Sequence, residues 1–439
     1  MNGNALEDGR PATNDAAPAV GDFKANDDAF KVASHVDPDR LLASIQALAR
    51  FGARADGGVD RPALSSIDLE ARRHLIERAH ALGCTVQTDA CANLFFRRAG
   101  TEDLAPVMSG SHVDTQPTGG KLDGCYGVLA AFECIAALED AGIRPRRPLE
   151  AVIWTNEEGT RFQPGAMGSS AFVDPVAITR YREARDRDGI TLAEAIAAHQ
   201  AAFPALGLRT SNEAAHAFVE LHIEQGPLLE LAGVPLGVVT GIQGVRWYSI
   251  RSEGVAAHAG TTPMHARRDA MTLALAVRAE LEASASALGR DATRITFGRW
   301  SVEPNSINTI PATVIFTVDF RHPDPAILAA FDQMLTDCVK RHGAASETLF
   351  EHPPVHFPSA VTAPIARACD ALGATSLTLT SGAFHDAMYL AQHCPSAMLF
   401  VPSRNGISHN PLEATDDEHL VLGTRALAHC LVHLCNEAS

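Results

Sequence analysis

Two short segments of this 439-residue chain place imidazole and carboxylate groups at the ends of apolar runs. The first runs from His112 through a glycine-rich turn to Asp123, and the second contains the adjacent acids Glu157 and Glu158. A hydrolytic metal site needs metal ligands and, beside them, a general base that is not itself bound to the metal. The two glutamates provide one carboxylate for each task, so these residues predict metal-assisted hydrolysis.

Five side chains are candidate metal ligands, and each lies at or just after a run that we predict to be a strand. In open α/β sheets, ligands bind outside the carboxyl ends of the strands. Nitrogen and oxygen ligands without cysteine suit one or two Zn²⁺ ions, with Mn²⁺, Co²⁺ and Ni²⁺ as alternatives. The five candidates are His112, Asp123, Glu158, His222 and His409.

The residues around these ligands suggest supporting roles. Asp123 is the natural bridge between two ions, because the glycines of its loop allow a sharp turn towards them. Asp114 lies two residues after His112, where its carboxylate could accept the second ring N–H of that imidazole. Glu157 is then the general base. A single histidine near an apolar strand is more often structural, and adjacent glutamates are often only solvated charge. The joint occurrence of these features favours the metal site.

The elements that position these residues follow an α/β pattern. Apolar runs at residues 105–110, 149–155 and 218–223 predict buried strands, alternating with predicted helices at 66–82 and 127–141. Between residues 242 and 357 the order becomes β-α-β-β-α-β, the split βαβ pattern of a small α+β sandwich. We therefore predict a catalytic domain with a central mixed sheet flanked by helices, formed by residues 31–241 and 358–439. The small sandwich is inserted into it as a lid at 242–357, and residues 1–30 are predicted to be a disordered arm.

Composition excludes several classes of partner. The net charge of -16 argues against nucleic acid or an anionic membrane surface. No apolar run is long enough to cross a bilayer, and no secretory signal is found. Nine cysteines without a CxxC pair favour reduced thiols and a cytoplasmic location.

Taken together, the motifs resemble the amidohydrolase branch of the dinuclear-metal M20 peptidases. That branch includes N-carbamoyl-L-amino acid hydrolases, β-ureidopropionases and allantoate amidohydrolases. The resemblance extends from residue 35 to the C-terminus. It rests on His112-Val-Asp-Thr, Asn156-Glu-Glu-Gly, Glu220-Leu-His-Ile-Glu-Gln-Gly and Ser408-His.

The resemblance implies a role for each matching position. His112 and His222 would hold one metal ion, Glu158 and His409 the other, with Asp123 bridging and Glu157 as base. In the lid, His258 would steady the substrate carbonyl. The implied substrate-binding residues are Gln225, Asn308, Arg321, Gly382 and His385.

The resemblance also implies a homodimer formed through the lid. The glycines at 241 and 244 predict a hinge for lid closure. Whether the lid residues complete their own site or that of a partner subunit stays open. Arg321 could instead pair with Asp319 or Asp324, and Asn308 could serve a turn before Pro311.

The expected activity is hydrolysis of the carbamoyl C–N bond of N-carbamoyl-L-amino acids to the amino acid, ammonia and CO₂. Allantoate and the β-amino acid substrates of β-ureidopropionases present the same groups and are alternatives. A dipeptidase would need a pocket for an ammonium group, which we do not find in the sequence. A non-catalytic binding protein is the alternative of another class, and the retained Glu157 argues against it. The substrate side chain and the native metal stay open.

Overall fold

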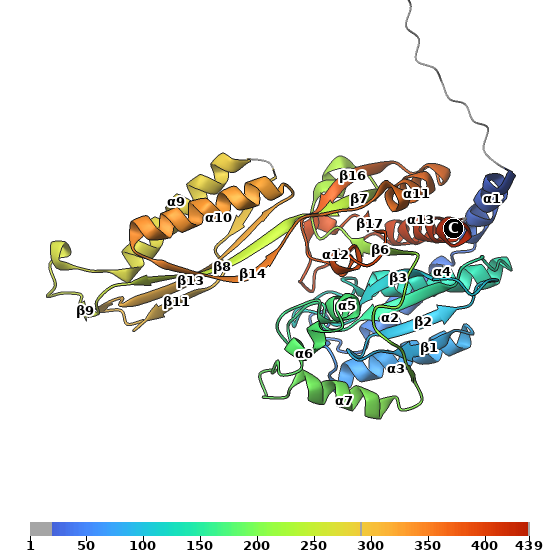
Figure 1. Cartoon of the computed structure of the whole chain (residues 1–439), viewed down its shortest axis with the longest axis horizontal. Helices are drawn as coiled ribbons and strands as arrows, with labels where there is room; N and C mark the ends of the chain where they lie inside the picture. The colour runs from blue at the N-terminus through green and yellow to red at the C-terminus, as the bar shows by residue number, and fades with distance from the viewer. Residues whose placement is uncertain (1–19, 290–291, 438–439) are drawn as a thin grey trace, which may run out of the picture.

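The computed structural model describes residues 20–289 and 292–437, and it consists of two lobes of unequal size (Figure 1). The larger lobe is built on a mixed ten-stranded sheet and the smaller on a five-stranded sheet. The predicted fold class, a central mixed sheet flanked by helices, is confirmed. In the described part of the chain, no helix combines the length and hydropathy that crossing a membrane requires. All nine cysteines are free and buried.

The large sheet has the strand order β15-β7-β17-β6-β3-β4-β2-β1-β5, with β16 beside β7. Its strands β17, β6, β3 and β4 are parallel neighbours, so their carboxyl ends share one edge of the sheet. These four strands are buried along their whole length, as a parallel sheet covered on both faces requires. The strands are β1 (Thr85–Thr88), β2 (Leu94–Arg98), β3 (Val107–His112), β4 (Leu149–Trp154), β5 (Gly207–Leu208), β6 (Ala217–Ile223), β7 (Leu236–Ile242), β15 (Val355–His356), β16 (Ser376–Ser381) and β17 (Ser396–Val401).

Helices cover this sheet, and α4 is the most buried of them. Nearly every residue of α4 is apolar and inaccessible, because the helix packs on β3, β4 and β6 and is covered by α13, α2 and α1. The helices are α1 (Val20–Ser34), α2 (Pro38–Ala49), α3 (Ser66–Ala81), α4 (Cys125–Ala141), α5 (Met167–Val173), α6 (Ala177–Tyr181), α7 (Leu192–Ala202), α8 (Leu228–Ala232), α11 (Ser359–Ala371), α12 (Ala387–Leu390) and α13 (Asp417–Asn436), with a short 3₁₀ helix η2 (Arg404–Gly406).

The N-terminal segment differs from the prediction. Residues 1–19 lie outside the described residues, but residues 20–30, predicted to be disordered, belong to helix α1. This helix packs against α13 and α4, and Ala29 and Val32 are fully buried there. The segment is too polar to indicate a helix by its sequence pattern. Its few small apolar residues are nevertheless enough to dock it onto an apolar surface.

The smaller lobe has two helices on one face of its sheet. Alternate residues of β13 are buried under α9 and α10, while the residues between them lie on the uncovered face. The elements are β8 (Gly244–Glu253), α9 (Ala270–Leu288), β10 (Arg294–Thr296), β11 (Trp300–Glu303), β13 (Thr313–His322), α10 (Pro325–His342) and β14 (Ala345–His352). At the end furthest from the large sheet, β9 (Ala257–His258) pairs with β12 (Thr309–Ile310), and a 3₁₀ helix η1 (Met264–Ala266) follows β9.

One predicted lid strand is divided in two. Where the predicted order has one strand after the first lid helix, the structure has two, because β10 ends at Thr296 and β11 begins at Trp300. The backbone N–H of Arg299 donates to Thr317 Oγ1 over 3.0 Å, which fixes the bend between the two strands. Both strands still pair with β13, so the β-α-β-β-α-β order of the lid is kept.

Two adjacent connections join the lobes. Strand β7 of the large sheet ends at Ile242 and β8 begins at Gly244, while the returning β15 pairs antiparallel with β7. The predicted boundaries at 242 and 357 lie at this junction. We propose on this basis that residues 242–357 form a separate domain that can move about it.

Candidate active site

Four parallel strands bring the predicted ligands to one edge of the large sheet. His112 and His222 lie near the carboxyl ends of β3 and β6. Glu157 and Glu158 follow β4, and His409 lies in the loop after β17. Asp123 stands just before α4, whose N-terminus meets the same edge. Residues separated by almost 300 positions in the sequence are therefore neighbours in space.

Asp123 lies between two groups of candidate ligands. Its Oδ1 is 3.2 Å from His222 Nε2 and 3.8 Å from His112 Nε2. Its Oδ2 is 3.1 Å from His409 Nε2, which is in turn 3.6 Å from Glu158 Oε2. Within each group, the three ligand atoms lie within 4.8 Å of one another. All five predicted ligands are thus brought together, with Asp123 shared.

The two buried imidazoles direct their Nε2 atoms towards Asp123. His112 Nδ1 is 2.9 Å from the carbonyl oxygen of Asp114, and His222 Nδ1 is 2.9 Å from that of Ile223. A carbonyl can only accept, so each Nδ1 carries a proton, and Nε2 is the nitrogen of each ring that is left to bind a metal ion once it is deprotonated. One group therefore offers two imidazole nitrogens and a carboxylate, and the other offers two carboxylates and an imidazole. Both donor sets fit a divalent ion such as Zn²⁺.

Gly124 allows this close approach. Its φ is +65°, and a Cβ at this position would lie 2.4 Å from the imidazole ring of His112. A side chain here would push His112 away from Asp123. The glycine-rich turn seen in the sequence thus has a steric reason at this position.

Glu157 lies beside the ligands without belonging to either group. Its Oε2 is 3.5 Å from His112 Nε2, and its side chain is buried. Burial, and next to it the carboxylates of Asp386 and Glu158, raise the pKa of Glu157 well above its usual value. Burial and Asp123 likewise raise the pKa of Glu158 to about 8. So many carboxylates in one buried place are expected to attract cations strongly.

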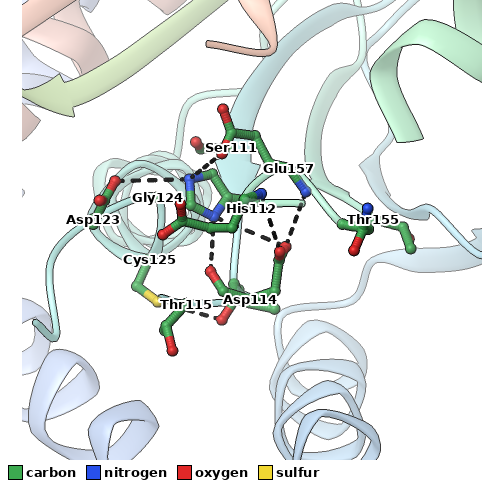
Figure 2. A network of polar contacts seen from close by, with 12 residues as sticks. Ser111, His112, Asp114, Thr115, Asp123, Gly124, Cys125, Thr155 and Glu157 are labelled. Atoms are coloured by element: carbon green, nitrogen blue, oxygen red, sulfur yellow. Dashed lines mark hydrogen bonds and ion pairs between the residues drawn. The ribbon is translucent and has the colours of Figure 1, made fainter. Parts of the chain in front are cut away.

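Asp114 does not make the contact that the sequence suggested. Its Oδ1 is 3.9 Å from His112 Nδ1, which bonds instead to the Asp114 main chain. The carboxylate accepts the backbone N–H groups of Glu157 and Glu158 at 3.3 and 3.2 Å, and Figure 2 shows Asp114 beside Glu157. Asp114 therefore orients the turn that presents both glutamates. The prediction failed because the turn after β4 offers N–H donors that are closer than the imidazole.

Three residues that the sequence analysis missed also hold the ligands. Gln116 donates to Glu158 from its backbone N–H and, at 2.6 Å, from its side-chain amide. Glu413 accepts the backbone N–H groups of Leu122 and Asp123, and Ser408 donates to Glu413 at 2.8 Å. In the sequence, Ser408 stands out only as the neighbour of His409. For Gln116 and Glu413, residue type and spacing gave no signal.

A cavity of about 540 Å³ opens over the ligands and reaches the root of the smaller lobe. Of the predicted substrate-binding residues, it is lined by Gln225, Arg321 and His385. Gln225 Nε2 donates to Asp123 Oδ2 at 2.9 Å, and Gln225 Oε1 is buried without a partner among the described residues. His385 is buried with its ring 4.7 Å from that of His222.

Arg321 forms an ion pair with Asp319, which was the alternative to a role in substrate binding. Its guanidinium bonds to both oxygens of Asp319, and its Nη1 donates to the carbonyl oxygen of Gly382 at 2.8 Å. A guanidinium has five N–H donors, so others remain for a ligand in the cavity. Gly382 itself contributes this carbonyl and does not line the cavity over the ligands.

His258 and Asn308 are not brought to this cavity. They belong to the β9–β12 tip at the opposite end of the smaller lobe (Figure 1). His258 is exposed and its Nδ1 accepts the backbone N–H groups of Gly260 and Thr261. Asn308 accepts a hydrogen bond from Ser306. Both residues therefore lie far from this chain's own ligand cluster.

The chain is similar to known hydrolases along nearly its whole length. Residues 108–433 match the profile of Peptidase family M20/M25/M40. An N-carbamoyl-L-amino acid amidohydrolase from Geobacillus stearothermophilus is 36% identical over 91% of this chain and 99% of its own. An allantoate amidohydrolase from Bacillus subtilis is 36% identical over 89% of this chain and 96% of its own. The crystal structure of an amidase of the hydantoinase/carbamoylase family from Burkholderia multivorans is 42% identical, with a TM-score of 0.85 over 92% of this chain and 99% of that chain.

Proposed function

This chain belongs to peptidase family M20/M25/M40, and we propose that it hydrolyses the carbamoyl C–N bond of N-carbamoyl-L-amino acids with two divalent metal ions. It is a hydrolase of C–N bonds in linear amides, as its curated relatives are. One observation supports the dinuclear proposal above others, namely that two three-residue ligand groups share Asp123 while Glu157 stays outside both.

We assign His112 and His222 to one ion and Glu158 and His409 to the other, with Asp123 between them. Zn²⁺ suits these ligands best, and Mn²⁺, Co²⁺ or Ni²⁺ are alternatives. When bound, such ions make water nucleophilic at neutral pH and polarise the scissile carbonyl.

Glu157 moves the proton in the proposed reaction. Its carboxylate takes a proton from water as the water oxygen bonds to the ureido carbon, and it returns a proton to the leaving nitrogen as the C–N bond breaks. A carboxyl group whose pKa is raised well above its usual value is suited to both steps. One water is consumed, and the carbamate that remains decomposes, so that the products are the amino acid, ammonia and CO₂.

Substrate binding is assigned to groups that line the cavity. The unpartnered Oε1 of Gln225 would accept a ureido N–H. The N–H groups of Arg321 that Asp319 and Gly382 do not use would bind the substrate carboxylate. His385 would line the same space.

The lid residues are proposed to act across a homodimer. His258 and Asn308 lie far from their own cluster, and exposed apolar side chains flank them, Val255 and Ile307. An exposed apolar tip with polar groups is suited to contact a second copy. His258 of one subunit would then donate to the oxyanion formed in the site of the other. Mixing a Glu157→Gln protein with a His258→Ala protein should restore activity, because the mixed dimer contains one complete site. Absence of any recovery after confirmed subunit exchange would contradict the assignment.

The activity is tested with metal-stripped protein to which Zn²⁺, Mn²⁺, Co²⁺ or Ni²⁺ is returned singly. Ammonia release is measured from N-carbamoyl-L-amino acids, from N-carbamoyl-β-alanine and from allantoate. Metal-dependent release from the α-amino acid derivatives supports the proposal. Release only from allantoate would favour the activity of the Bacillus subtilis relative. No release from any compound would favour a binding protein that keeps the fold.

A further inference from the structure

The cavity above the ligands has an aromatic wall that the hydrolytic chemistry does not use. Its floor is polar and carries the ligand cluster, whereas its side towards the smaller lobe is formed by Trp247, Phe350 and Phe384. Arg299 lies on the same side. A volume of about 540 Å³ exceeds what a ureido group and a carboxylate require, so room remains for a substrate side chain against this wall.

Strand pairing and a β-bulge build the wall. Trp247 on β8 is the register partner of Phe350 on β14, and their ring centroids are 5.2 Å apart. The register shifts between Thr348 and Phe350, so the pairing skips Leu349. A bulge re-aims the side chain next to it. Phe350 thereby faces the cavity, while Leu349 is exposed and does not line it. Phe384 of the larger lobe continues the wall, and its ring centroid is 5.8 Å from that of Phe350.

The wall lies on the face of the small sheet that α9 and α10 leave uncovered. On β13, Val318 and Phe320 are buried under the helices, and Asp319 and Arg321 are on the other face. Trp247 is the register partner of Asp319, so it shares that face. The proposed carboxylate-binding Arg321 and the aromatic wall are therefore neighbours on one surface.

Two polar groups at the wall have no partner within the described residues. The indole Nε1 of Trp247 is buried and has no hydrogen-bond partner there. The Arg299 side chain is exposed, and no ion pair or hydrogen bond of its guanidinium is found in residues 20–289 and 292–437, although its backbone is fixed to Thr317. Because Arg299 lines the same cavity as the aromatic rings, its guanidinium could also contact the face of a substrate ring bound there.

We propose, on the basis of the proposed function, that this wall binds the substrate side chain and that the preferred substrates are N-carbamoyl-L-amino acids with an aromatic side chain. The side-chain ring would pack against Trp247 and Phe350, with the Arg299 guanidinium near its face. Allantoate carries a second ureido group where such a side chain would be. The wall offers that group only donors, Trp247 Nε1–H and the Arg299 guanidinium, so its N–H groups would lose their hydrogen bonds to water without replacement and allantoate should be a poor substrate.

The test compares kcat/KM for N-carbamoyl-L-phenylalanine, N-carbamoyl-L-alanine and allantoate in the metal-loaded full-length protein. Wild type should prefer the phenylalanine derivative over the alanine derivative by about tenfold or more. Trp247→Ala should lower that ratio about tenfold, whereas Trp247→Phe should keep most of it because a ring remains. Leu275→Ala is the matched control, since Leu275 is an exposed leucine of the same lobe on helix α9, which covers the opposite face of the sheet, and its ratio should equal that of wild type.

A second measurement does not depend on turnover. In the Glu157→Gln background, calorimetric titration should show N-carbamoyl-L-phenylalanine binding about tenfold more weakly when Trp247→Ala is added. A merely structural role for Trp247 would weaken the alanine derivative equally, and that result would overturn the inference. So would a wild-type preference for the alanine derivative or for allantoate, although the proposed hydrolysis would then stand. If no ureido compound is hydrolysed by wild type, the proposed function fails and the inference fails with it.

Discussion

Glu413 should control the metal site without contacting the ions. It is buried and joins two loops, since it accepts the backbone N–H groups of Leu122 and Asp123 at 2.9 and 3.1 Å and the hydroxyl of Ser408 at 2.8 Å. Asp123 Oδ2, at 3.3 Å, is the more distant alternative acceptor for the same hydroxyl proton. Glu413 therefore fixes the main chain of Asp123 and the orientation of the Ser408 hydroxyl beside the Asp123 carboxylate. Replacing it with alanine removes three hydrogen bonds and leaves two backbone donors buried without a partner.

The magnitude follows from these contacts. A hydrogen bond to a charged acceptor contributes about 1.5–3 kcal/mol net, and three that share one carboxylate are not additive. Burial and Asp123 raise the pKa of Glu413, so the cost of a buried charge offsets part of this gain. We expect Glu413→Ala to lower the free energy of unfolding by about 3 kcal/mol. Metal affinity should fall about 10- to 100-fold, as for other residues that orient ligands.

Glu413→Gln is the matched control. Glutamine keeps an amide oxygen for the two backbone N–H groups, and Ser408 can turn its hydroxyl to accept from the new amide. The free energy of unfolding of the Glu413→Gln variant should fall by only about 1 kcal/mol. Urea denaturation of metal-free protein gives the stability, and calorimetric titration with Zn²⁺ gives the affinity. Equal and unchanged metal affinities in both variants would refute the positioning role.

Three further predictions concern the same cluster. Glu157→Gln should keep the wild-type metal content while the turnover number for ammonia release falls about a thousandfold, and near-normal turnover would exclude Glu157 as base. Gly124→Ala should displace His112, because the new Cβ would lie 2.4 Å from its ring, and should lower the melting temperature and the metal content together. An unchanged metal content would contradict the steric argument. The metal-free protein should lose stability as the pH rises from about 5 to about 8, because the pKa of Glu158 is raised from 4.5 to about 8 and the folded state then binds more protons than the unfolded state. The thermal shift caused by Zn²⁺ should grow over the same range, since the ion replaces those protons, and a shift that shrinks would contradict this reasoning.

The sequence predicted the ligand cluster because strand ends converge by a general rule. His112, Glu158 and His222 each follow an apolar run, and parallel strands present their carboxyl ends at one edge. This convergence of strand ends does not depend on which side chains contact one another. The order of elements in the inserted lobe was predictable for the same reason, since hydrophobic periodicity reports burial against a neighbouring layer.

The contacts that hold the ligands could not be predicted in this way. Glu413 bonds to backbone groups 290 residues away, and no local pattern encodes such a distance. Asp114 had two acceptable partners, an imidazole and a pair of backbone N–H groups, and only the geometry of the turn after β4 decides between them. Helix α1 was missed because its burial depends on the surface formed by α13 and α4.

The central claim is that five side chains hold two ions on either side of Asp123. Anomalous diffraction from crystals of the zinc-loaded protein, with data on both sides of the zinc absorption edge, tests it most directly. We predict two peaks, one beside His112 and His222 and the other beside Glu158 and His409, with Glu157 bound to neither. A single peak, or a peak among Glu220, His222 and His385, which also lie within 4.8 Å of one another, would contradict the account.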